Sequence, residues 1–239
     1  MSVEDLDVLI VGAGLSGIGA ACHLRRECPD KRLAIIEGRA ALGGTWDLFR
    51  YPGIRSDSDM YTLGYSFRPW TDPQAIADGP SIRRYIEDTA REHGVDSLIR
   101  YRHRVLRAEW DSAQALWTLQ VKRGEEAEPV QLRCRMLVLC TGYYRYEAGY
   151  TPAFPGRERF TGTFIHPQHW PQDFAPDGRR ILVIGSGATA VTLVPALVEQ
   201  GAQVTLLQRS PSYVINLPQQ DRVLAALRRL LPATWVYRL

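Results

Sequence analysis

Residues 7–17, DVLIVGAGLSG, decide the fold that the sequence predicts. Asp7 to Val11 is a short apolar run of the kind that is buried in a parallel sheet. Three glycines follow in a G-x-G-x-x-G pattern, in which the first permits a tight turn, the second lets the backbone approach a pyrophosphate, and the third lets a helix pack close to the strand. They are Gly12, Gly14 and Gly17. The stretch predicts a strand, a dinucleotide-binding turn, and a helix to about Arg26.

A second predicted strand, Arg32 to Ile36, ends in Glu37, 25 residues after Gly12. An acid at this place in a dinucleotide-binding unit accepts hydrogen bonds from ribose hydroxyls. The alternative is a glycine-rich turn without a ligand. Because strand, glycines, helix, strand and acid follow in the expected order, the sequence favours a nucleotide site.

A second unit of the same kind begins with Arg180 to Ile184, which we expect to be a buried strand. Its glycine turn has the form G-x-G-x-x-A, made by Gly185, Gly187 and Ala190, and the helix after it contains Pro195, which should kink it or lie near its first turn. The next strand, Val204 to Leu207, leads to Arg209 and Ser210 where the first unit has an acid. An arginine can pair with a ribose 2′-phosphate that an acid would repel, so the second nucleotide is predicted to be NADPH.

Between the two units the pattern changes several times. Residues 38–80 predict a long loop, and Ser81 to His93 predicts a helix that ends at Gly94. Leu98 to Cys134 predicts an antiparallel meander, and Met136 to Cys140 a buried strand. The predicted fold class is therefore α/β, with two Rossmann-like dinucleotide-binding units, the first of which carries an inserted antiparallel β-meander.

Composition narrows the class of protein. With 45% hydrophobic and 23% charged residues, the chain is typical of a globular protein, and a net charge of +3 with scattered arginines argues against nucleic acid. No apolar run reaches the length of a membrane span and the N-terminus is acidic, so we expect a cytoplasmic protein. An amphipathic helix is predicted over Asp221 to Leu231; packing onto a sheet is favoured, and peripheral membrane association is the alternative. The four cysteines form no C-x-x-C pair and have no metal-ligand spacing.

Residues 160–171, FTGTFIHPQHWP, carry a resemblance to a known family. They match the F-x-G-x-x-x-H-x-x-x-W-P fingerprint of Baeyer–Villiger monooxygenases, which are class B flavoprotein monooxygenases. The similarity continues through residues 43–64, 140–144, 185–197 and 207–214. The fingerprint positions are Phe160, Gly162, His166, Trp170 and Pro171.

The resemblance implies two cofactors and several roles. FAD is expected in the first unit, with Gly44, Thr45 and Trp46 in a loop beside the flavin, and NADPH in the second. Asp57 matches an active-site aspartate that orients an essential arginine, and Arg55 lies in the same segment. His166 is expected to couple domains. The implied domains are 1–148 for FAD, 149–178 as a linker with the fingerprint, and 179–239 for NADPH.

The implied reaction is insertion of one oxygen atom of O2 into a ketone, or its addition to a sulfur compound, through a flavin peroxide. Relatives of this family are much longer, so the chain resembles their N-terminal half, with a fold that stops before completion, and an inactive nucleotide-binding fragment is the alternative. Amine oxygenation is less favoured, because related enzymes usually carry Tyr or Phe where this chain has Trp170. A disulfide reductase would need a redox cysteine pair beside the flavin, and no C-x-x-C is present.

Overall fold

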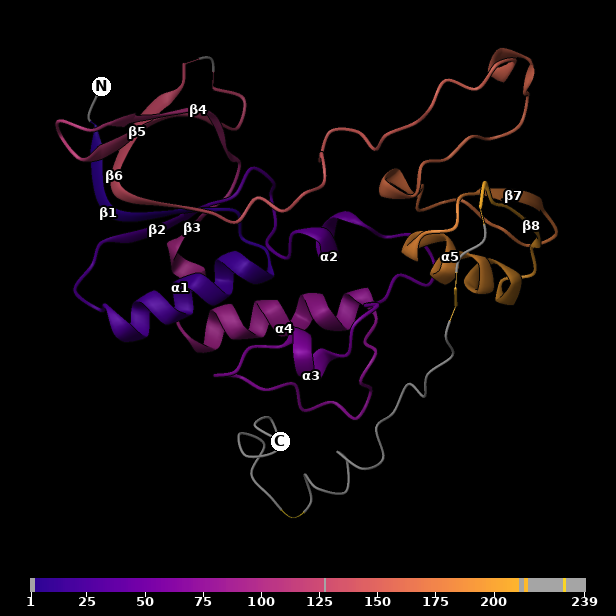
Figure 1. Cartoon of the computed structure of the whole chain (residues 1–239), viewed down its shortest axis with the longest axis horizontal. Coiled ribbons are helices and arrows are strands. Elements are labelled where there is room, and N and C mark those ends of the chain that lie inside the picture. Colours follow the sequence, from indigo (N-terminus) through magenta and orange to yellow (C-terminus); the bar gives the residue numbers. More distant parts are fainter. Residues whose placement is uncertain (1–2, 127, 211–212, 215–229, 231–239) are drawn as a thin grey trace. The chain divides into compact units, whose positions relative to one another are not determined.

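The computed structural model describes residues 3–126, 128–210, 213, 214 and 230 (Figure 1). The chain forms two compact units, each made of two separate stretches: Met1–Leu48 with Arg83–Tyr144, and Phe49–Ile82 with Arg145–Leu239. The predicted domain boundaries describe nucleotide binding rather than compactness, and they stay a prediction. The helix predicted for Asp221 to Leu231 lies, apart from Leu230, outside the described residues.

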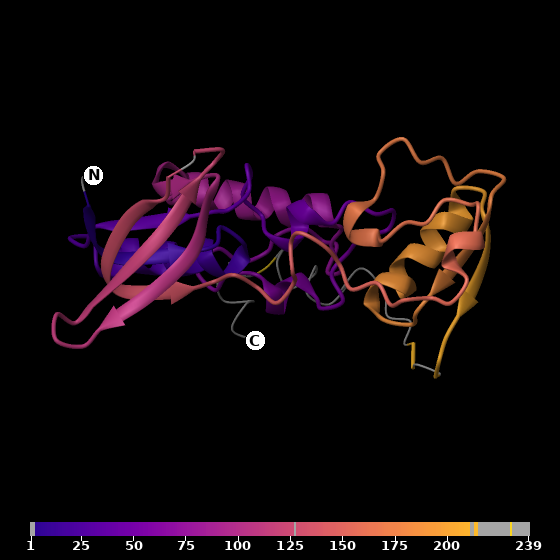
Figure 2. The same ribbon diagram turned by 90° about the horizontal axis from the view of Figure 1, so that it is seen from above.

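One mixed sheet forms the centre of the first unit, with strand order β3-β2-β1-β6-β5-β4. The central strand β1 pairs in parallel with β2 and β6, whereas β5 is antiparallel to both β4 and β6 (Figure 2). The α/β fold and the meander are thus confirmed, and the meander is one side of the same sheet. The strands are β1 (Glu4–Val11), β2 (Leu33–Ile36), β3 (Ile99–Arg100), β4 (His103–Asp111), β5 (Leu116–Arg123) and β6 (Val130–Leu139).

Helix α1 (Leu15–Glu27) follows β1 and packs beside β1 and β2, as predicted (Figure 1). The side chains of Leu9, Ile10, Ile18 and Ile35 are fully buried. Removing an aliphatic side chain of this size from water contributes about 1.5–3 kcal/mol. This core fixes the strand end at which the first glycine turn begins. Helix α4 (Gly79–Glu92) also lies where a helix was expected, and a short 3-10 helix, η1 (Asp96–Leu98), leads from it to β3.

The last strand of the sheet corrects two expectations. Met136 to Cys140 was expected as a separate buried strand, but β6 runs without interruption from Val130 to Leu139. Met136 is 55% exposed and Leu139 is 68% exposed. The reason lies in the pairing, because β5 leaves β6 at the Trp117–Cys134 pair while β1 continues along it to Leu139. The second half of β6 therefore has a strand on one side only among the described residues.

The stretch 49–82 belongs to the second unit and is largely irregular, as expected, but it is packed. The stretch contains the short helix α3 (Met60–Leu63). Helix α2 (Thr45–Leu48), which ends just before the stretch begins, belongs to the first unit. The chain doubles back on itself, since Ser56 N donates to Ala77 O at 2.9 Å and Met60 N to Ala75 O at 2.7 Å. Tyr51, Met60 and Trp70 are buried. Although it has little regular secondary structure, this long segment is therefore folded and packed.

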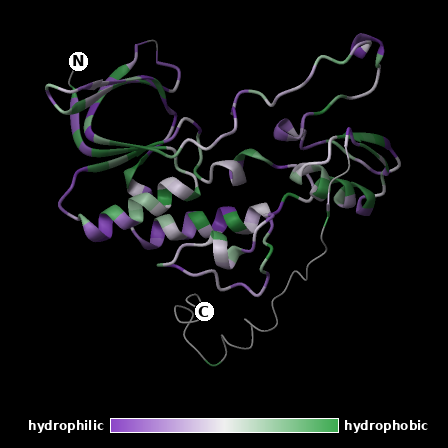
Figure 3. Ribbon diagram, in the orientation of Figure 1, coloured by the Kyte–Doolittle hydropathy of each residue, from purple (hydrophilic) through white to green (hydrophobic). Residues whose placement is uncertain are grey.

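The second unit also contains a parallel pair of strands, β7 (Arg180–Ile184) and β8 (Gln203–Leu207), joined through helix α5 (Ala188–Glu199). Strand, turn, helix and strand appear in the predicted order. β7 is not buried as expected: Leu182 is 56% exposed and Ile184 is 51% exposed, on the apolar ribbon that Figure 3 colours green. Helix α5 packs on both strands. Pro195 lies inside α5, well past its first turn.

A 3-10 turn, η2 (Arg157–Arg159), precedes the fingerprint stretch of the second unit, and a second one, η3 (Pro167–His169), lies within it. Within the described part of the chain, no helix combines the length and the apolar character needed to cross a membrane.

Candidate functional site

The first glycine turn is held so tightly that two of its glycines have no room for a side chain. Gly12 has a φ of +106°, and a β-carbon added there would overlap the Cys140 carbonyl oxygen. At Gly17 an added β-carbon would overlap the carbonyl oxygen of Gly12 itself. The turn is anchored by a 2.8 Å hydrogen bond from Gly12 N to Ile36 O. Both glycines therefore let helix α1 start directly against the end of β1.

Glycine stands at the amino end of α1. The N-cap residue is Gly14, which has no side chain that could cap the first turn of the helix. First-turn amides without a side-chain cap, together with the helix dipole, attract phosphate oxygens. A second turn lies against this end, since Gly43 N donates to Ala13 O at 2.9 Å and Gly44 Cα is 3.5 Å from the position of a Gly14 β-carbon. The predicted Gly44 loop is thus beside the phosphate turn, with Thr45 and Trp46 half-buried in α2.

Glu37 lies at the end of β2, as the sequence predicts, and only 8% of it is exposed. Its Oε2 accepts a hydrogen bond from Ala13 N and its Oε1 accepts one from Arg39 N, each at 2.9 Å. A carboxylate offers about four acceptor positions on its two oxygens. After these two backbone bonds it can still accept hydrogen bonds from a vicinal diol such as that of a ribose. The two hydrogen bonds, from Ala13 N and Arg39 N, fix the orientation of the carboxylate and so the direction of its remaining acceptor positions.

The second glycine turn differs from the first in how much space surrounds it. Gly185 has a φ of +127°, which favours glycine, yet a β-carbon at Gly185 or at Gly187 would meet nothing within 4 Å. Gly187 is the N-cap of α5, again without a side-chain cap, and Ala190 is buried in the first turn of α5. Packing therefore explains Ala190 but not Gly187. Open space over an uncapped helix end suits a ligand phosphate.

Arg209 and Ser210 follow β8 and are both exposed. Gly185 N donates to Leu207 O at 2.9 Å, so the end of β8 is bonded to the start of the turn. The structure thus brings the turn and the segment containing Arg209 together within the second unit. No ion pair joins Arg209 to an acid among the described residues.

The fingerprint residues form a folded loop of the second unit. His166 packs so closely on Gly149 that a β-carbon on Gly149 would overlap the imidazole ring. Burial, and then the neighbouring His169, lower the pKa of His166, so its ring is neutral at pH 7. This agrees with a 3.2 Å hydrogen bond from Gln168 N to His166 Nδ1. Trp170 meets Phe174 edge to face, with 5.4 Å between ring centroids.

The remaining fingerprint positions are more open. Phe160 is 55% exposed, and its ring lies where a β-carbon on Gly162 would be; Pro171 is half-buried. Sequence reasoning missed Gln168, which is 4% exposed and whose Nε2 donates to Arg145 O at 2.7 Å and Tyr146 O at 3.1 Å. Its signal was weak, because the fingerprint leaves that position free. Gln168 ties the fingerprint to the chain that enters it.

Asp57 and Arg55 lie in the packed segment 49–82. Asp57 is exposed and Arg55 is half-buried, and no hydrogen bond or ion pair joins their side chains in the described part of the chain. The backbone of Arg55 forms an isolated antiparallel bridge with Asp78. The same segment contacts α5 within the second unit, since Tyr51 Oη is 3.3 Å from Thr192 Oγ1 and a β-carbon on Gly53 would overlap Thr192 O. The sequence did not indicate this contact.

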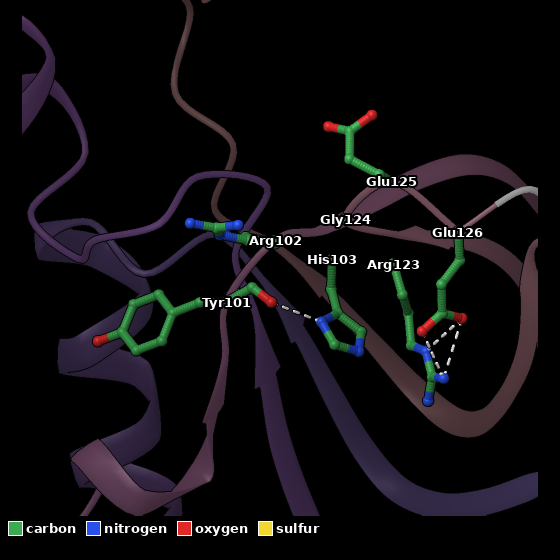
Figure 4. Close-up of a pocket in the computed structure, with 7 residues that line it drawn as sticks. All are labelled: Tyr101, Arg102, His103, Arg123, Gly124, Glu125 and Glu126. Atoms are coloured by element: carbon green, nitrogen blue, oxygen red, sulfur yellow. Dashed lines mark hydrogen bonds and ion pairs between the residues drawn. The ribbon is translucent and has the colours of Figure 1, made fainter.

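A hollow of the first unit lies elsewhere, at the start of β4 and the β5–β6 turn (Figure 4). It has a volume of about 600 Å³ and is open to solvent. Arg102 N donates to Arg39 O and His103 N donates to Glu37 O, so its wall adjoins the segment after β2. Arg123 is paired with Glu126, and His103 Nδ1 is 2.7 Å from Tyr101 O. The glycine turns do not line this hollow.

The comparisons with known proteins agree with this geometry. The family model described as pyridine nucleotide-disulphide oxidoreductase matches residues 6–229. The FAD-containing monooxygenase EthA of Mycobacterium tuberculosis is 55% identical over 235 residues, which are 98% of this chain and 48% of EthA. The chain therefore spans about half the length of the curated relatives that it matches.

Solved structures show the same relationship. A steroid monooxygenase bound to NADP superimposes with a TM-score of 0.80 at 32% identity, over 98% of this chain and 43% of that one. Cyclohexanone-bound cyclohexanone monooxygenase superimposes with a TM-score of 0.76 at 26% identity, over 90% of this chain and 40% of that one. The resemblance to Baeyer–Villiger flavoprotein monooxygenases, indicated by residues 160–171, is thus confirmed. The chain belongs to the pyridine nucleotide-disulphide oxidoreductase family, and its relatives there are FAD-containing monooxygenases.

Proposed function

We propose that this chain forms the two nucleotide-binding units of an NADPH-dependent flavin monooxygenase that oxygenates ketones or sulfur compounds with O2. One observation carries the proposal. Two glycine turns begin helices whose N-cap residue is glycine, and the first leads to the buried acid Glu37 whereas the second leads to the exposed cation Arg209. Together with the fingerprint at residues 160–171, this pairing fits FAD in the first unit and NADPH in the second.

Several groups of the first unit support FAD as its cofactor. Without side chains at Gly12 and Gly14, the pyrophosphate can approach the backbone at the amino end of α1, and Gly17 lets that helix start close by. The Glu37 carboxylate would accept bonds from the ribose hydroxyls while Ala13 N and Arg39 N hold it. Gly44, Thr45 and Trp46 would lie along the cofactor toward the flavin.

The second unit has an equivalent arrangement for NADPH. Gly185 and Gly187 leave space for the pyrophosphate above α5, and Ala190 packs beneath it. Arg209 would pair with the 2′-phosphate, and Ser210 would donate its hydroxyl. The substitution Arg209→Ala should therefore weaken NADPH binding at least tenfold, and NADH binding less than threefold, in a titration of the whole protein. Equal losses for both nucleotides would contradict this role.

FAD, when bound, accepts a hydride from NADPH and supplies the electrons that activate O2. The chain's own task is then to position groups and to exclude water. We propose that Asp57 orients a catalytic arginine, with Arg55 from the same segment adding positive charge. The neutral ring of His166 and the buried Gln168 would keep the fingerprint loop in one conformation as the domains move. A ketone substrate is favoured by Trp170 and by the cyclohexanone bound to a structural relative.

Turnover of the whole protein tests the proposal. Purified protein loaded with FAD should consume NADPH faster when cyclohexanone or a dialkyl sulfide is added. It should release lactone from the ketone or sulfoxide from the sulfide, in an amount equal to the NADPH consumed. Tight FAD binding without any oxygenated product from a panel of ketones and sulfides would refute the monooxygenase assignment.

A second candidate is a nucleotide-binding protein without oxygenase turnover. It is favoured by the exposure of Asp57, which has no ion-pair partner among the described residues. In this case FAD and NADPH should bind with normal affinity, and NADPH oxidation should not respond to ketone. Disulfide reduction receives no support, because the sequence has no C-x-x-C and all four cysteines are free.

A further inference from the structure

Asp47 is a buried acid to which the proposed function gives no role. Its side chain is 2% exposed, and it lies in α2, four residues after Gly43. Burying a carboxylate costs several kcal/mol unless cations and hydrogen bonds compensate. In this unit the compensation comes from two arginines distant from each other in the sequence, since Arg39 Nη2 lies 2.5 Å from Oδ2 and Arg83 Nη1 lies 3.3 Å from Oδ1.

Arg39 connects this acid to the proposed FAD site. Its backbone N–H donates to Glu37 Oε1 at 2.9 Å, and its Nη1 donates to Gly44 O at 3.2 Å. The other oxygen of Glu37 accepts from Ala13 N, and Ala13 O accepts from Gly43 N. The phosphate turn, the ribose acid, Arg39 and the Gly43–Gly44 turn therefore form a closed ring of hydrogen bonds, and Asp47 holds the guanidinium that closes it.

Arg83 holds Asp47 from the other side. It projects from α4, where its Nη2 also pairs with Glu87 at 2.9 Å. Its Nε is buried and has no hydrogen-bond partner among the described residues. At Gly43, which has a φ of +113°, an added β-carbon would lie 3.2 Å from Asp47 Cβ and 3.3 Å from Arg83 Cγ. Both side chains thus pack directly on the turn that faces the phosphate-binding glycines.

We propose that Asp47, acting through Arg39, is a positioning residue of the nucleotide site, which sets the Gly43–Gly44 turn and the Glu37 carboxylate for bound FAD. The inference rests on the proposed function, because it names FAD as the ligand. Asp47 touches neither the cofactor nor substrate in this reading. Its negative charge keeps the Arg39 guanidinium on Gly44 O instead of letting it turn toward the pyrophosphate or solvent, while the backbone N–H of the same arginine holds Glu37.

The test is the FAD dissociation constant of the whole protein, measured by flavin fluorescence after removal and readdition of FAD. Asp47→Asn is nearly isosteric, and it should raise the constant tenfold or more and alter the visible circular dichroism of the bound flavin. The matched control is Asp5→Asn, which breaks the double hydrogen bond to Arg133 at a strand end of the same unit and should change the constant less than twofold. Thermal unfolding without FAD reports separately on the fold.

A second variant keeps the test informative if Asp47→Asn does not fold. Arg39→Lys retains the charge but loses the rigid fork that holds Gly44 O and Asp47 through two separate nitrogens, so it should weaken FAD binding in the same direction. In the double variant, the two effects should be less than additive, because both break one ring.

The outcomes separate the two claims. An unchanged or lower dissociation constant in Asp47→Asn and Arg39→Lys, with FAD bound by the unsubstituted protein, would overturn the positioning role and leave the proposed function standing. A lower melting temperature with the same constant would have the same meaning, because Asp47 would then serve only the fold. Failure of the unsubstituted protein to bind FAD would overturn both.

Discussion

Gly17→Ala sets two physical effects against each other. Gly17 lies in the first turn of α1 and has helical backbone angles, so alanine should favour the helix by about 1 kcal/mol. The added β-carbon, however, would lie 3.0 Å from the Gly12 carbonyl carbon and would overlap its oxygen. Nonbonded carbon and oxygen atoms normally stay about 3.3 Å or more apart, so the turn must shift by about 1.4 Å.

The overlap should win. Overpacking of this kind costs about 1–3 kcal/mol, and the Gly12 turn cannot yield freely, because its N–H is bonded to Ile36 O at 2.8 Å. Because the overlap is deep and with backbone atoms, its cost should lie at the upper end, about 2–3 kcal/mol; subtracting the gain of about 1 kcal/mol in helix propensity leaves an expected loss of unfolding free energy of about 1–2 kcal/mol. With a urea dependence of about 2 kcal/mol per molar, the midpoint should fall by about 0.5–1 M. Urea unfolding followed by circular dichroism measures this shift.

A natural counterpart provides the control. The third position of the second turn is Ala190, which the structure accommodates in α5. Ala190→Gly should lower the unfolding free energy by about 1 kcal/mol through helix propensity alone, because no steric overlap is present there to be relieved. If Gly17→Ala instead raised the urea midpoint, the close contact between α1 and the Gly12 turn would be refuted, along with the steric requirement for glycine at that position.

Acid should weaken the fold through Glu4, because a hydrogen bond from Arg100 lowers the pKa of the Glu4 carboxyl in the folded protein. The stabilisation is complete above the pKa that Glu4 has in the unfolded chain, and it is lost as the pH falls through the lower pKa of the folded protein. The urea midpoint of Glu4→Gln should therefore fall less between pH 6 and pH 3 than that of the unsubstituted protein, and an equal fall would contradict it. Burial raises the pKa of the Cys22 and Cys134 thiols to about 11, so iodoacetamide at pH 8 should spare both until urea is added; peptide mass spectrometry would expose any native labelling. Tyr51→Phe should cost about 1 kcal/mol by removing the buried bond to Thr192, while Tyr61→Phe, at an exposed 3.4 Å bond, should change the urea midpoint little; equal effects would argue against the packing of residues 49–82 on α5.

Local spacing predicted the strands and helices around both glycine turns. The strands before both glycine turns, the helices after them and the positions of Glu37 and Arg209 follow from short-range patterns, because turn geometry and helix starts depend on a few neighbouring residues. Exposure was predicted less well. The apolar runs Arg180 to Ile184 and Met136 to Cys140 resemble buried strands, yet their exposure depends on which elements pack on them and where a partner strand ends.

The sequence by itself determined the two glycine turns between strand and helix, the family fingerprint, and the contrast between the acid after the second strand of one unit and the arginine in the other, since each depends on residues close together in the chain. Only the tertiary structure decided that Arg39, Asp47 and Arg83 meet behind the Gly43–Gly44 turn, that Gln168 is buried, and that residues 49–82 pack on α5. The physical reason is that compensation of a buried charge or amide depends on distance in space. When the partners lie in separate elements, their spacing in the sequence does not indicate how far apart they are in space. The sequence therefore contained no sign that Asp47 is a buried carboxylate paired with two arginines.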